Sequence, residues 1–91
     1  FKMKLNEKYL PIGTVVKLTG QLNRFMITGF CPIEANDENT EWDYMGCFFP
    51  EGIADSRKAN LFNHEQIKSI EYIGFIDDEE KEFKARLQEL L

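Results

Sequence analysis

The sequence predicts a small α+β domain, either an SH3-like antiparallel β-barrel or a bent four-stranded sheet, with a C-terminal amphipathic helix. Three observations predict it: short runs of β-branched and aromatic residues, glycines inside three of those runs, and helical periodicity at the end of the chain. The 91 residues are enough for one domain with a modest core. We expect an N-terminal extension over residues 1–8, a β-rich body over 9–76 and the helix over 77–91.

The first three strands are expected over residues 14–18, 24–30 and 42–49. Turn residues between the first two favour a β-hairpin. Gly29 interrupts the second strand, which indicates a bulge or the close approach of another backbone. The third strand also has a glycine, Gly46, in its middle. A polar, acidic loop over 34–41 precedes the third strand, and a surface connection over 53–61 follows it. These elements alone account for most of a bent sheet.

The last two elements carry local start signals. Asn63 and Gln66 have the spacing of a capping box, so a single helical turn is expected before a fourth strand over 67–75. Asp77 and Asp78 precede the final helix and favour its start. An apolar stripe recurs along this helix at i, i+4, i+7 and i+8, at Phe83, Leu87, Leu90 and Leu91. We expect the stripe to cover sheet surface, although its terminal leucines could equally meet a partner.

The net charge of −5 is distributed unevenly along the chain. Residues 1–33 carry five basic side chains and one acidic, whereas residues 34–91 carry six basic and fifteen acidic. An acidic body repels phosphate backbones, which disfavours nucleic acid as a partner and favours a basic region of another protein. A nucleic-acid-binding barrel would have to rely on the basic N-terminal third. We expect no membrane span, because no apolar stretch is long enough.

Candidate chemistry is sparse. Cys31 and Cys47 are expected to be reduced, half-buried thiols of a cytoplasmic protein. With a single histidine, His64, we expect neither a Cys/His metal site nor a cofactor site, and the acidic loop lacks the spacing of an EF-hand. A catalytic interpretation would pair Cys47 with His64, but the position of His64 indicates a role in capping the short turn. The chain is therefore expected not to be an enzyme.

Aromatic residues are numerous, at 13% of the chain, and a domain of this size can fully bury only some of them. Tyrosine and tryptophan are enriched at protein-binding surfaces. We therefore expect a protein-binding surface to draw on the aromatic residues that flank turns and on the helix stripe. The predicted binding residues are Tyr9, Trp42, Tyr44, Phe49, Tyr72, Leu87 and Leu90.

Four blocks, residues 9–18, 25–31, 43–52 and 61–67, together resemble a small family of Firmicutes proteins catalogued as a domain of unknown function. The genes of that family lie beside type VII secretion loci and their LXG-class toxins. The resemblance covers nearly the whole chain from Tyr9 to the terminal helix, with the acidic loop as a variable spacer. It brings no catalytic motif.

The resemblance implies a cytosolic accessory protein that binds a secreted LXG-class toxin or its small helical partners. Such a protein would act as adaptor, chaperone or targeting factor. The alternative is an immunity protein that neutralises a cognate toxin domain, with its acidic surface as substrate mimic. A small enzyme remains a remote alternative.

Overall fold

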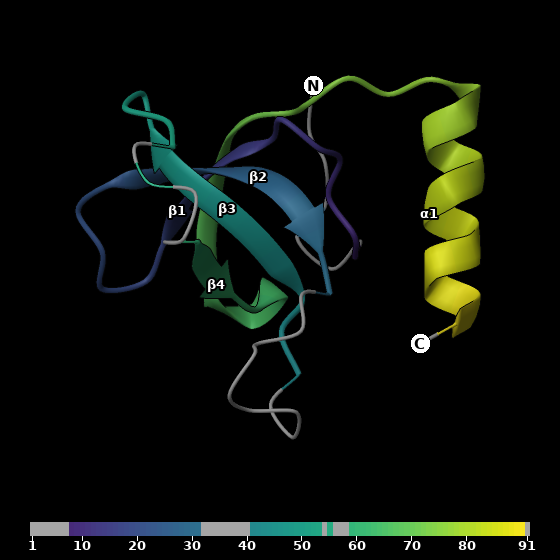
Figure 1. The fold of residues 1–91 in the computed structure, drawn as a ribbon, viewed down its shortest axis with the longest axis horizontal. Coiled ribbons are helices and arrows are strands. Elements are labelled where there is room, and N and C mark those ends of the chain that lie inside the picture. The colour runs from purple at the N-terminus through teal and green to yellow at the C-terminus, as the bar shows by residue number, and fades with distance from the viewer. Residues whose placement is uncertain (1–7, 32–40, 54, 56–58, 91) are drawn as a thin grey trace.

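The computed structural model describes residues 8–31, 41–53, 55 and 59–90. Five antiparallel strands form one open sheet in the order β4-β3-β2-β1-β5 (Figure 1). They are β1 (Val15–Leu18), β2 (Arg24–Phe30), β3 (Tyr44–Phe49), β4 (Asn60–Phe62) and β5 (Ile67–Tyr72). A 3₁₀ turn, η1 (His64–Gln66), precedes β5, and one helix, α1 (Asp78–Leu90), ends the described chain. The predicted α+β class is confirmed.

The sheet has one strand more than predicted. β4 lies at the end of the stretch expected to be a surface connection, and it pairs with β3 through Tyr44 opposite Phe62 and Gly46 opposite Asn60. The described strands form an open sheet whose edges are β4 and β5. β1 lies inside the sheet rather than at its edge, since it pairs with both β2 and β5.

The glycines of β2 and β3 lie at an irregular and a crowded position of the sheet. The β2–β3 register shifts between Ile27 and Gly29, which is the predicted irregularity. A Cβ atom at Gly46 would lie 2.6 Å from the Met26 carbonyl oxygen, so this position needs the close approach that only glycine permits. The predicted irregularity at Gly29 is confirmed, and Gly46 adds a close backbone contact in the next strand.

The core lies within the bend of the sheet and is completed by the segment before β1. Its members share near-zero exposure and mutual contact: Tyr9, Leu10, Val16, Leu18, Phe25, Ile27, Tyr44, Phe62 and Ile67. Phe30, Cys31, Ile70 and Leu87 pack against them. Leu87 is the contribution of α1 to this cluster, so the helix covers one side of a core that the strands already form.

Residues 73–77 carry the chain from the end of β5 to α1, which stands beside the sheet (Figure 1). Asp77 caps the helix, because its Oδ1 accepts a hydrogen bond from the Glu80 N–H at 2.8 Å. The described part of α1 has no buried residue, and Leu90 is 81% exposed. The expectation that the stripe covers the sheet holds only in part. Among the described residues, no helix is both long and apolar enough to cross a membrane.

Candidate functional site

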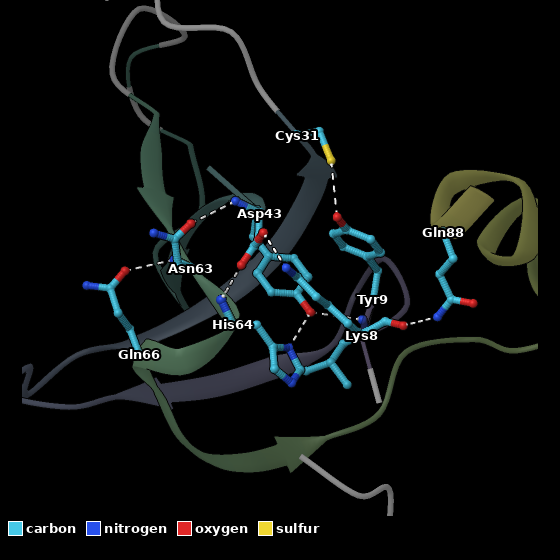
Figure 2. A network of polar contacts seen from close by, with 10 residues as sticks. Lys8, Tyr9, Cys31, Asp43, Asn63, His64, Gln66 and Gln88 are labelled. Carbon is cyan, nitrogen blue, oxygen red and sulfur yellow. Dashed lines mark hydrogen bonds and ion pairs between the residues drawn. The ribbon is translucent and has the colours of Figure 1, made fainter. Parts of the chain in front are cut away.

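A buried phenol lies at the centre of the polar network of this domain. Tyr44, the first residue of β3, is 0% exposed. Its Oη accepts a hydrogen bond from the Leu10 N–H at 3.1 Å and lies 2.7 Å from His64 Nδ1 (Figure 2). The rings of Phe62 and Tyr9 pack against it at centroid distances of 5.4 and 6.0 Å. The hydroxyl therefore joins the segment before β1 to η1 through the core.

The carboxylate of Asp43 extends this network toward the surface. Lys8 Nζ lies 2.8 Å from its Oδ1, and the His64 N–H donates to its Oδ2 at 2.8 Å. The Asp43 N–H donates in turn to Asn63 Oδ1 at 3.0 Å. Three stretches of chain that are distant in sequence thus meet at one residue (Figure 2).

The short turn is stabilised from within as well. The Asn63 N–H donates to Gln66 Oε1 at 2.7 Å, the reach-back bond of a capping box, so the predicted pairing is confirmed. With His64 Nδ1 bonded to Tyr44, the geometry gives this histidine a structural role beyond capping.

Burial raises the pKa of Tyr44 far above its ordinary value near 10, and the nearby Asp43 carboxylate raises it further. Burial also raises the pKa of Tyr9, whose Oη lies 3.8 Å from Cys31 Sγ. Both phenols therefore stay neutral over the physiological range, where each can act as a hydrogen-bonding group. The network is suited to holding backbone segments in place.

The remaining candidates for chemistry are scattered. The two cysteines form no disulfide; Cys31 is half-buried, as predicted, whereas Cys47 is buried. Within the part of the chain that the structure describes, no three His, Cys, Asp or Glu side chains are grouped to hold a metal ion. The acidic stretch proposed as a spacer lies, except for Glu41, outside the described residues.

The seven predicted binding residues divide by exposure. Tyr9 and Tyr44 are 5% and 0% exposed, so the expectation that they lie at the surface is wrong. Their hydroxyls find partners inside the domain, which removes the cost of burying them. Trp42, Phe49 and Leu87 are half-buried. Tyr72 and Leu90 are 67% and 81% exposed and remain available for contact.

An exposed apolar corner lies beside the edge strand β5. Ile12, Tyr72 and Phe75 are 49%, 67% and 78% exposed, and we refer to them as the β5 corner. The backbones that carry them are neighbours, because Tyr72 is paired with Val15 and the Gly74 backbone lies against the Ile12 carbonyl. Sequence analysis missed Ile12 and Phe75, although an aromatic on the mixed face of the expected strand was a signal.

Acidic side chains flank the β5 corner on both sides in the sequence. Glu71 precedes Tyr72, and Asp77, Asp78 and Glu79 follow Phe75; all of them are exposed. Lys17 lies 3.8 Å from Glu71 and offsets part of this charge. An apolar surface with acidic neighbours suits a segment that carries both apolar and basic side chains.

Comparison with known families finds a match over most of the chain. The family model DUF4176, described as a domain of unknown function, matches residues 9–83. No curated protein and no solved structure matches the chain.

Proposed function

The chain belongs to the DUF4176 family of domains of unknown function, and from that premise we propose that it is a non-catalytic protein-binding module. Its role is that of a cytosolic accessory protein of a type VII secretion system, which binds an LXG-class toxin or its partners as adaptor, chaperone or targeting factor. The secretion context follows from the resemblance described above. The β5 corner is the observation that supports a binding role.

The exposure of this corner favours a partner. Three large apolar residues on neighbouring backbone segments are at least 49% exposed, near the edge strand β5. Clustered apolar side chains on a soluble surface mark interaction sites more often than single ones do. The acidic flank from Asp77 to Glu79 would attract a basic segment and repel an acidic one.

Co-expression of the chain with the toxin encoded beside it tests this function. The variant Tyr72→Ala/Phe75→Ala should lower toxin recovery in a pull-down by about tenfold or more, since two exposed aromatic contacts are lost. Its melting temperature should stay near that of the wild type. The matched control is Leu22→Ala, because Leu22 is 99% exposed and lies in the turn after β1, at the other end of the sheet.

Three outcomes would contradict the proposal: no complex with any neighbouring gene product, equal recovery of the double variant and the wild type, or loss of binding in the Leu22→Ala control. A further variant, Cys47→Ala/His64→Ala, addresses catalysis. If it abolishes a biological effect while toxin binding and folding persist, the non-catalytic assignment is wrong.

The acidic surface also favours a second candidate, an immunity protein that covers a cationic active site. Truncation of the toxin separates the two. Binding that maps to the secretion-targeting part or the adjoining segment supports the adaptor. Binding that is lost only without the toxic domain, together with rescue of poisoned cells, supports immunity.

A further inference from the structure

Helix α1 contacts the rest of the domain through only part of its surface. Leu87 packs against the core cluster, and Gln88 Nε2 donates a hydrogen bond to the Lys8 carbonyl oxygen. Glu80 and Lys84, one turn apart, are only 17% and 19% exposed. The face that α1 turns toward the domain therefore centres on Glu80, Lys84 and Leu87. Phe83 lies at the margin of this face, because its ring lies 5.9 Å from that of Phe30 between centroids while 53% of the residue stays exposed. Leu90 points away from the domain.

A second face of the helix is left exposed. Phe83 and Leu90 are 53% and 81% exposed, and their spacing of seven residues places them along one line of the helix. Arg86 lies between them in the sequence and Glu79 lies one turn before Phe83; both charged residues are exposed. We call Glu79, Phe83, Arg86 and Leu90 the outer seam; their spacings of four, three and four residues are those of a two-helix contact.

The charges of the outer seam are complementary to themselves in one orientation. Glu79 lies one turn before Phe83, and Arg86 lies almost one turn after it. When two copies of α1 are antiparallel and cross near Phe83, Glu79 of each copy faces Arg86 of the other. Parallel copies would instead place like charges together. Two-fold symmetry then produces each favourable contact twice.

We propose that two copies of this chain associate through an antiparallel pair of α1 helices at the outer seam. Phe83 of the two copies meets near the two-fold axis, and Leu90 packs toward the start of the opposite helix. Arg86 bonds to Glu82 of its own helix at 2.7 Å, and its five N–H donors leave it able to bind a second carboxylate. Figure 1 shows α1 at one side of the molecule, beyond the described strands.

The contact is small. A helix of 13 residues buries less than a standard interface does, so the dimer is a weak one that forms at high protein concentration. The proposal is independent of the toxin partner, because the purified chain alone forms the contact. It adds a consequence for the proposed function, since a dimer presents two β5 corners.

Sedimentation equilibrium over a wide concentration range tests the proposal. Glu79→Arg and Arg86→Glu should each raise the dissociation constant about tenfold, because each turns two favourable charge contacts into repulsive ones. The matched control is Glu89→Arg on the same helix but off the seam, which should leave the dissociation constant unchanged. Far-UV circular dichroism should show equal helix content in all variants.

Mixing the two variants gives the decisive result. One then carries arginine at both positions and the other carries glutamate at both, so an equimolar mixture should associate more strongly than either variant alone. A chain that stays monomeric at the highest concentration overturns the proposal. So does self-association that neither charge reversal weakens, or a mixture that associates no better than its components.

Discussion

Removal of a single oxygen atom by Tyr44→Phe tests whether the buried network stabilises the fold. The substitution keeps the ring contacts with Phe62 but leaves the Leu10 N–H, in a residue that is 0% exposed, without its acceptor. An unsatisfied buried donor costs about 1–3 kcal/mol, and loss of the contact with His64 Nδ1 adds roughly 1 kcal/mol. We therefore expect the free energy of unfolding to fall by about 2–4 kcal/mol.

Urea denaturation followed by fluorescence measures this loss. With a slope of about 1 kcal/mol per molar urea for a small domain, the midpoint should fall by about 2–4 M with the slope unchanged. Tyr9→Phe is the matched control, because Tyr9 is equally a core residue but its Oη has a sulfur atom at 3.8 Å as partner. Its cost should stay below about 1 kcal/mol. Equal midpoints for the two variants would refute the reasoning.

Three further predictions follow from the geometry. The folded-state pKa of Tyr44 lies above its unfolded value near 10, so unfolding at high pH releases a proton from this residue. The contribution of Tyr44 to stability should be constant below about pH 9 and then fall by up to about 1.4 kcal/mol per pH unit. Tyr44→Phe should therefore lessen the fall of stability with pH in urea titrations at about pH 9–11. Gly74→Ala would place a Cβ atom 2.0 Å from the Ile12 carbonyl oxygen and should lower the free energy of unfolding by more than about 3 kcal/mol. Gly20→Ala, at φ +80° but with open space around the Cβ position, should lower it by only about 1 kcal/mol. Thermal melts of the two variants compare these losses directly. Leu87→Ala should weaken the packing of α1 against the core by about 1–2 kcal/mol. Amide hydrogen exchange should then become faster in residues 78–90, while the interior strands keep their protection. Faster exchange throughout the domain would contradict this prediction.

Local signals in the sequence were sufficient for most of the fold. The β2 bounds match the prediction because the apolar run from Arg24 to Phe30 is enclosed by turn residues and Pro32. Asp77 identified the start of α1, since capping depends on residues within one turn. β4 was missed because its three residues show no periodicity, and pairing with β3 is what makes them a strand.

The site was less predictable because its contacts are non-local. A tyrosine that flanks a turn is expected to keep its hydroxyl in water unless a buried partner is provided. For Tyr44 the partner is the Leu10 N–H, 34 residues away in the chain, which no local pattern reveals. The orientation of α1 was hidden for the same reason: periodicity defines an apolar stripe but not which side of it meets the sheet.

The pairing of β1 on both of its edges has a consequence for the order in which the domain can fold. One edge of β1 pairs with β2, which follows it within a few residues, but the other edge pairs with β5, where Val15 meets Tyr72. During synthesis the hairpin can therefore form early, while the second edge of β1 must wait for the last strand. Until then an apolar strand stays open to chance pairing, so the nascent domain is most exposed to aggregation just before β5 emerges.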